Sequence, residues 1–267
     1  DEKRQRIMRR NVTAFLNSAL QNTEAMPQNI FFAVFSHLVI QFWRAAYLGG
    51  NLRPELSLFG DFLHRQMRLE YPQFVEPISA KPRNDGRRLR IGYVSTNFCH
   101  QAVSYYMANR IFFADKEQFE VYVFSLEKRH DAMSDRIKSF SDKYAAFTNV
   151  DVKNLAEIAG LIKQSDLDIL VFADIGMEPI NYQLGAMRLA PVQCVLVGHG
   201  ATTGLPTMDY YLSGDFEGPD AQAHYREKLI RLPNLGAAQM PPAFPPSGKM
   251  NRADFGLPQD KVLLVSC

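Results

Sequence analysis

Hydrophobic residues recur at helical spacing over residues 1–70, and this pattern predicts helices. The first apolar stripe consists of Ile7, Val12, Phe15, Leu16 and Leu20. Pro27 can begin a second helix that ends before Gly49 and Gly50, and Pro54 fits the first turn of a third helix that runs to about Glu70. Such helix pairs could be the end of a helical repeat array, although the segment contains no clear repeat.

The hydrophobic pattern changes after residues 71–88, a segment whose prolines and arginines predict a linker. From residue 89 onward, short apolar runs of the kind found in buried parallel strands alternate with amphipathic segments. Strands are expected at 89–95, 119–124, 144–147, 167–172, 192–197, 209–212 and 229–232. Helices are expected at 103–113, 132–139, 154–163 and 180–188. This alternation predicts an α/β fold, with a mostly parallel sheet covered by helices on both faces.

The last part of the chain is rich in proline, with six prolines between residues 233 and 260. Such a segment is typical of a loop that connects domains. The apolar run at 261–266 would then be the first strand of a second domain that the chain does not continue. The predicted organisation is a helical region at 1–80, an α/β region at 81–240, and a connector with one strand at 241–267.

Composition and charge exclude several classes of protein. The 267 residues are 46% hydrophobic and carry a net charge of +2, so no strong electrostatic bias toward nucleic acid exists. No apolar run is long enough for a membrane span, and we expect no signal peptide, because the first ten residues are mostly charged and no apolar h-region follows them. Three cysteines without a CxxC spacing indicate a reducing compartment, and we expect a cytoplasmic protein.

Three loops at the expected carboxyl ends of strands are rich in reactive and small residues. They span residues 95–106, 173–179 and 198–204, and ligands of open parallel sheets gather at this edge. In the third loop, small residues let the backbone approach a phosphate or a sugar hydroxyl closely. Its candidate ligand-binding residues are Gly198, Gly200, Thr202, Thr203 and Gly204. The alternative is a tight turn with no ligand, because the loop is neither a P-loop nor a GxGxxG motif.

His100, His199 and Asp174 are candidate acid/base groups in these loops. The alternatives are hydrogen-bonded loop histidines and an aspartate that caps a turn. A metal site is not expected, because the histidines lack HxH or HxxxH spacing. Cys99 precedes His100, but adjacent side chains at a strand end point apart, which favours an inert thiol over a nucleophile.

Seven short segments follow one another between residues 89 and 233. They are LRIGYVS at 89–95, FEVY at 119–122, DILV at 168–171, AMRLAPVQ at 186–193, GHGATTG at 198–204, DY at 209–210 and HYREKL at 224–229. In this order they resemble the O-GlcNAc transferase and SPINDLY family of protein glycosyltransferases. The APVQ segment that leads to the Gly-His loop is most similar to bacterial members, including relatives of the cytoplasmic glucosyltransferases that modify adhesins on asparagine.

The resemblance implies a GT-B fold of two facing Rossmann-like halves, preceded by a helical region that is often built of tetratricopeptide repeats. The C-terminal half, which makes most nucleotide contacts in the family, would begin near residue 261, so the chain alone is expected to be inactive. The donor would be a nucleotide sugar, usually UDP-GlcNAc or UDP-glucose. The acceptor would be a Ser, Thr or Asn side chain of a protein. Family members invert the anomeric carbon and need no metal or other cofactor.

The resemblance also gives the candidate residues their roles. The loop at 198–204, with His199, matches the family loop that faces the sugar and diphosphate, and Asp174 falls where relatives carry a polar residue near the sugar. Gln101 departs from the family pattern, because it stands where relatives have a histidine, and His100 lies one residue earlier. Glutamine can donate a hydrogen bond to a phosphate oxygen, but it cannot transfer a proton at neutral pH.

Three alternatives follow from the glutamine: His100 takes over the role, Gln101 suffices electrostatically, or the protein is catalytically impaired. The last alternative corresponds to a non-catalytic binding or scaffold protein. An oxidoreductase or an α/β hydrolase is excluded on motifs, since the chain has neither GxGxxG after the first predicted strand nor a GxSxG elbow.

Overall fold

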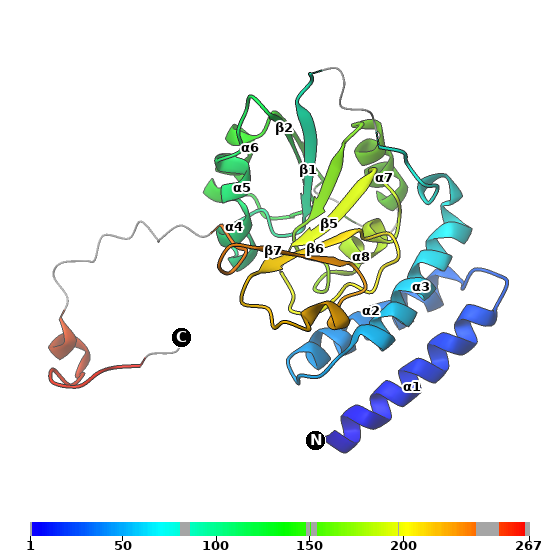
Figure 1. Cartoon of the computed structure of the whole chain (residues 1–267), viewed down its shortest axis with the longest axis horizontal. Coiled ribbons are helices and arrows are strands. Elements are labelled where there is room, and N and C mark those ends of the chain that lie inside the picture. Colours follow the sequence, from blue (N-terminus) through cyan, green and yellow to red (C-terminus); the bar gives the residue numbers. More distant parts are fainter. Residues whose placement is uncertain are drawn as a thin grey trace.

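The computed structural model describes residues 2–80, 86–147, 150, 154–196, 198–238 and 251–264, with side chains from residue 6 onward. Figure 1 shows a central sheet with helices against it and three long helices side by side along one flank. This arrangement confirms the predicted α/β class with a helical N-terminal region.

The three N-terminal helices are α1 (Glu2–Gln21), α2 (Gln28–Ala46) and α3 (Arg53–Glu70), and a short 3-10 helix, η1 (Pro72–Phe74), follows them. Pro54 lies in the first turn of α3, where a missing amide proton leaves no helical carbonyl unpaired. Aromatic rings pack α2 against α3. The ring of Phe59 stacks on that of Phe35, with ring centroids 5.9 Å apart, and packs against that of Phe42, with ring centroids 5.3 Å apart.

Seven strands in the described part of the chain form one sheet. They are β1 (Leu89–Ser95), β2 (Phe119–Ser125), β3 (Lys143–Ala146), β4 (Ile169–Phe172), β5 (Val192–Leu196), β6 (Tyr210–Gly214) and β7 (Lys228–Leu232). Their order is β3-β2-β1-β4-β5-β6-β7, and every neighbouring pair is parallel. The chain builds the sheet from β1 in one direction and then returns to add β4 on the other side. The boundary between β1 and β4 is therefore the topological switch point, where open α/β sheets bind ligands.

The remaining helices are α4 (Ala102–Met107), α5 (Asn109–Phe112), α6 (Ala132–Phe140), α7 (Leu155–Gln164), α8 (Pro179–Gly185) and the 3-10 helices η3 (Ala221–His224) and η4 (Arg252–Phe255). The predicted helices at 132–139 and 154–163 agree with the structure to within one residue at each end, whereas the one predicted at 180–188 is shorter. The single helix expected at 103–113 is broken at Ala108 into α4 and α5. Residues 261–264 of the expected last strand pair with no strand in the described structure, and residues 265–266 lie outside it.

Two hydrophobic clusters cover the two faces of the sheet, because successive strand residues point to opposite sides. Val94 of β1 belongs to the cluster that includes α1, α2, α3, α7 and α8, whereas the adjacent Tyr93 belongs to the cluster of α4, α5 and α6. The N-terminal helices thus share one core with the sheet.

Polar contacts also fix α3 to the sheet region. The Arg226 guanidinium pairs with Asp61 of α3 at 2.8 Å and donates to the carbonyls of Ser57 and Gly204. One ring nitrogen of His64 lies 2.8 Å from the Ala186 carbonyl oxygen. The predicted boundary near residue 80 stays a prediction, and the shared core means that the helices and the sheet stabilise each other.

Candidate functional site

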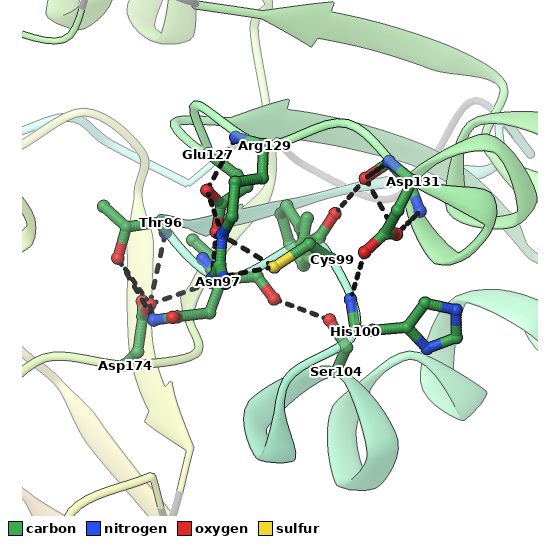
Figure 2. Close-up of polar contacts among 12 residues, drawn as sticks. Thr96, Asn97, Cys99, His100, Ser104, Glu127, Arg129, Asp131 and Asp174 are labelled. Atoms are coloured by element: carbon green, nitrogen blue, oxygen red, sulfur yellow. Dashed lines mark hydrogen bonds and ion pairs between the residues drawn. The ribbon is translucent and has the colours of Figure 1, made fainter.

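Asp174 lies at the switch point, directly beyond the carboxyl end of β4. Its side chain is fully buried and accepts five hydrogen bonds. Four of them end on Oδ2, from the Ser95 hydroxyl (2.9 Å), the Thr96 amide (3.1 Å), the Thr96 hydroxyl (2.9 Å) and the Asn97 amide group (2.6 Å). The fifth comes from the Asn181 side chain to Oδ1 at 2.6 Å. Figure 2 shows Thr96 and Asn97 converging on this carboxylate.

These contacts define what Asp174 does. They join the loop after β1 to the loop after β4 and to α8, so the carboxylate fixes the edge of the sheet. Burial raises the pKa of Asp174, and the hydrogen bonds from Asn97, Ser95 and Thr96 oppose that rise. The candidate acid/base group of the sequence analysis is therefore a positioning residue in the structure, without a face open to a ligand.

His199 lies in the loop after β5 and is buried against two neighbouring segments. Gly176, at a φ of 112°, packs so close that a Cβ there would lie 2.6 Å from the His199 ring. On another side the ring meets Tyr47, just beyond α2, with centroids 6.0 Å apart. Burial lowers the pKa of His199, which favours the neutral imidazole. The structure thus brings His199 next to the loop that carries Asp174.

The two threonines of the third loop face the protein interior. The carboxylate of Glu227 accepts hydrogen bonds from both hydroxyls and, at 2.8 Å, from the Thr203 amide. The Thr202 hydroxyl also accepts from the amides of Gly204 and Arg226, each at 3.1 Å. Thr202, Thr203 and Glu227 are all buried. Glu227 was not predicted from the sequence, because nothing local links it to a loop more than twenty residues earlier.

The three glycines of this loop have different surroundings. A Cβ on Gly198 would lie 2.3 Å from the Ala173 carbonyl oxygen, and one on Gly204 would lie 2.0 Å from the Leu56 carbonyl oxygen. These two positions need glycine for close backbone approach. Gly200 is exposed, and a Cβ there would meet no atom within 4 Å. Gly200 is thus the glycine of the loop that a ligand could approach. Binding of the sugar donor by the glycines and threonines of this loop stays a prediction.

His100 and Gln101 diverge at the start of α4. His100 is exposed, its amide donates to Asp131 at 2.8 Å, and its ring nitrogen Nδ1 lies 3.0 Å from the Tyr105 hydroxyl. In Figure 2 its ring points away from Asp174. Gln101 instead lines a cleft together with Thr96 and Asn97. Of the two neighbours, Gln101 therefore lies closer to the loops that Asp174 joins.

This cleft has a volume of about 490 Å³ and lies at the switch point, beyond β1, β2 and β4. Apart from the three residues of the first loop, its walls come from the loop after β2, from α8 and the residue before it, from α2, and from Val150 between β3 and α7. The residues are Phe32, Leu126, Glu127, Lys128, Arg129, Val150, Glu178, Pro179, Ile180 and Gln183. The charged residues of the cleft were not predicted from the sequence, since no motif marks them and only the strand order brings their loops together.

Cys99 is a buried thiol that belongs to a local ion pair. Its Sγ donates to a Glu127 carboxylate oxygen at 3.1 Å and accepts from the Arg129 guanidinium at 3.2 Å. Burial, and then the Glu127 carboxylate, raises the pKa of Cys99 to about 12. This environment agrees with the interpretation of an inert thiol, because the thiolate is the reactive form.

We expect Cys99 to resist alkylation by iodoacetamide at neutral pH in the folded protein and to react after unfolding in urea. Peptide mass spectrometry after a timed pulse measures both reactions. Labelling of the native protein at the rate of the unfolded chain would contradict the buried, protonated thiol.

Two further observations concern membranes and metals. Among the described residues, none of the helices combines the length and the apolar character that crossing a membrane requires. Within the same ranges, no three His, Cys, Asp or Glu side chains are close enough to hold a metal ion together. Whether the protein works without a metal stays a prediction.

A sequence model described as glycosyl transferase family 41 matches residues 63–236, which is more than half of the chain. One curated relative is the probable UDP-N-acetylglucosamine–peptide N-acetylglucosaminyltransferase SEC of Arabidopsis thaliana, 30% identical over 74% of this chain and 21% of the relative. The corresponding SPINDLY protein of Arabidopsis thaliana is 34% identical over 61% of this chain and 18% of the relative. The chain thus spans about a fifth of the length of these relatives.

A solved structure has the same arrangement of elements. The K341M mutant of the O-GlcNAc transferase of Thermobaculum terrenum superposes with a TM-score of 0.58 and 26% sequence identity. The match covers 78% of this chain and 43% of that chain. It confirms the predicted fold, a helical region followed by one Rossmann-like half of the GT-B type.

Proposed function

The chain belongs to glycosyl transferase family 41, and from this premise we propose that it is part of a protein glycosyltransferase. The enzyme transfers a sugar from a nucleotide donor, UDP-GlcNAc or another UDP-hexose, to a Ser, Thr or Asn side chain of a protein. The transfer inverts the anomeric carbon and needs no metal or other cofactor. The protein acts in the cytoplasm.

The observation that carries this proposal is the position of the cleft. It lies at the switch point of a parallel sheet, where Asp174 joins the loops and His199 packs against one of them. The curated relatives are named for UDP-N-acetylglucosamine as donor and a peptide as acceptor.

Glycosyl transfer makes two requirements of the residues at the carboxyl edge of the sheet. Transfer from a diphosphate requires stabilisation of the leaving phosphate and an acceptor aligned behind the anomeric carbon. Backbone amides around the exposed Gly200 can donate to phosphate oxygens, whereas the hydroxyls of Thr202 and Thr203 hold Glu227. The neutral imidazole of His199 can hydrogen-bond the sugar or the acceptor from the same loop.

The first test is a thermal-shift screen of UDP- and GDP-sugars on the full-length protein that contains this chain. A bound donor at 100 times its Kd stabilises the folded state by about 2.7 kcal/mol, so UDP-hexoses should raise Tm by several degrees. Mass spectrometry of co-expressed proteins should then find hexose or N-acetylhexosamine on Ser, Thr or Asn, with or without EDTA.

The alternative is a non-catalytic binding protein, for which Gln101 in the cleft is the specific support. Stabilisation by a nucleotide sugar without any transferred sugar would favour this alternative. Stabilisation by none of the sugars would contradict the proposed glycosyltransferase.

A further inference from the structure

Glu178 is the residue before α8 and lines the cleft to which the loop after β1 also contributes. Its backbone is extended, with φ −117° and ψ 131°, and its side chain is exposed. It follows Asp174 by four residues and Gly176 by two, so the loop that packs against His199 also carries this carboxylate. Gln101 and Asn97 line the same cleft.

The three carboxylates around the cleft differ in their partners. Asp174 is buried under its five hydrogen bonds, and Glu127 pairs with the Arg129 guanidinium at 3.3 Å and accepts from the Cys99 thiol. For Glu178, no donor in the described part of the chain hydrogen-bonds to the carboxylate, and no cation there lies within ion-pair distance. Glu178 is therefore the cleft carboxylate that is available to a ligand.

The charges that face Glu178 suit proton transfer. Partial burial and the negative charges of Asp174 and Glu127 raise the pKa of Glu178, and Lys128 opposes the rise. Arg129 also lines the cleft, but its charge is paired with Glu127. A carboxylate with a raised pKa accepts a proton more readily than an ordinary glutamate.

We propose that Glu178 is the catalytic base, which accepts the proton of the attacking acceptor group in the cleft that Gln101 lines. This inference rests on the proposed glycosyltransferase function. The acceptor oxygen or nitrogen forms the new bond to the anomeric carbon while the bond from that carbon to the diphosphate oxygen breaks. The bonding electrons leave with the nucleoside diphosphate, and the acceptor proton passes to the Glu178 carboxylate.

The test compares Glu178→Gln with Glu117→Gln in the full-length protein, using the UDP-sugar and the acceptor protein on which the unsubstituted protein is active. Glu117 is an exposed turn residue that precedes β2, whereas the cleft lies beyond the carboxyl end of that strand. We expect Glu178→Gln to lower kcat by roughly a hundredfold or more, the usual contribution of a general base. The KM for the donor should change by less than about threefold, and Glu117→Gln should match the unsubstituted protein.

The pH profile separates a base from a structural role. In the unsubstituted protein, kcat/KM should fall on the acid side at a pH above the ordinary glutamate pKa of about 4.3, and this acid limb should be absent in Glu178→Gln. A kcat within about threefold of the control, or an acid limb that persists, overturns the inference and leaves the proposed function intact. If the unsubstituted protein transfers no sugar, the proposed function fails and the inference falls with it.

Discussion

Replacing Asp174 with alanine is expected to lower the free energy of unfolding by about 3 kcal/mol or more, because several buried donors lose their acceptor. The carboxylate accepts from the Ser95 hydroxyl, from the amide and hydroxyl of Thr96, and from the side chains of Asn97 and Asn181. Each donor left unsatisfied in the interior costs about 1–3 kcal/mol, although some of them will find new partners. Urea denaturation, read as the change in midpoint, measures the effect.

Two further variants separate hydrogen bonding from volume and from charge. Asp174→Asn keeps the size but turns an amide group toward existing donors, so it should also destabilise the protein, by about 2 kcal/mol. Asp220→Ala removes an exposed aspartate whose side chain makes no capping hydrogen bond, and its effect should stay within about 0.5 kcal/mol. An Asp174→Ala protein as stable as Asp220→Ala would contradict the positioning role of Asp174.

The sheet was largely predictable from the sequence, because buried parallel strands appear as short apolar runs. β1 was predicted with its observed bounds, Leu89–Ser95, and β2 extends one residue beyond its prediction at the carboxyl end. β5 agrees with its prediction over Val192–Leu196, and residue 197 lies outside the described residues. The break between α4 and α5 was not predictable. Ala108 itself favours helix, so tertiary packing and not local propensity ends α4 there.

The candidate site was predictable in position but not in the direction of its side chains. The rule that ligands gather at carboxyl ends places the loops after β1, β4 and β5 together, and the structure does so. The inward direction of Thr202 and Thr203 depends on Glu227, which belongs to a later loop. Likewise, Glu178 and Lys128 share a cleft only through the strand order. Contacts between segments far apart in the chain leave no local pattern.

The glycine-rich loop at 198–204 also packs against the N-terminal helices, in addition to its proposed role in binding the donor. Gly204 has a φ of 69°, and its missing side chain lets the backbone touch the Leu56 carbonyl of α3. Gly60 of α3 makes the reciprocal approach, since a Cβ there would lie 1.9 Å from the Gly204 carbonyl oxygen. The loop after β5 is therefore in backbone contact with α3 of the N-terminal region.

We expect Gly204→Ala to lower the free energy of unfolding by about 2–5 kcal/mol, because the residue would be strained at positive φ and would collide with the α3 backbone. Gly200→Ala is the matched control from the same loop. It has open space at its Cβ position and should change stability by less than about 0.5 kcal/mol. Urea denaturation of the two variants, run in parallel, gives the comparison.

The same pair of variants distinguishes packing from ligand contact. If the exposed backbone at Gly200 faces the donor phosphates, Gly200→Ala should weaken the thermal shift produced by the UDP-sugar while leaving the stability of the free protein unchanged. Gly204→Ala should instead lower the stability of the ligand-free protein, because the atoms around Gly204 belong to the protein itself. Equal stability of the two variants would show that the α3 contact at Gly204 does not hold in solution. An unchanged thermal shift in Gly200→Ala would remove Gly200 from the donor site.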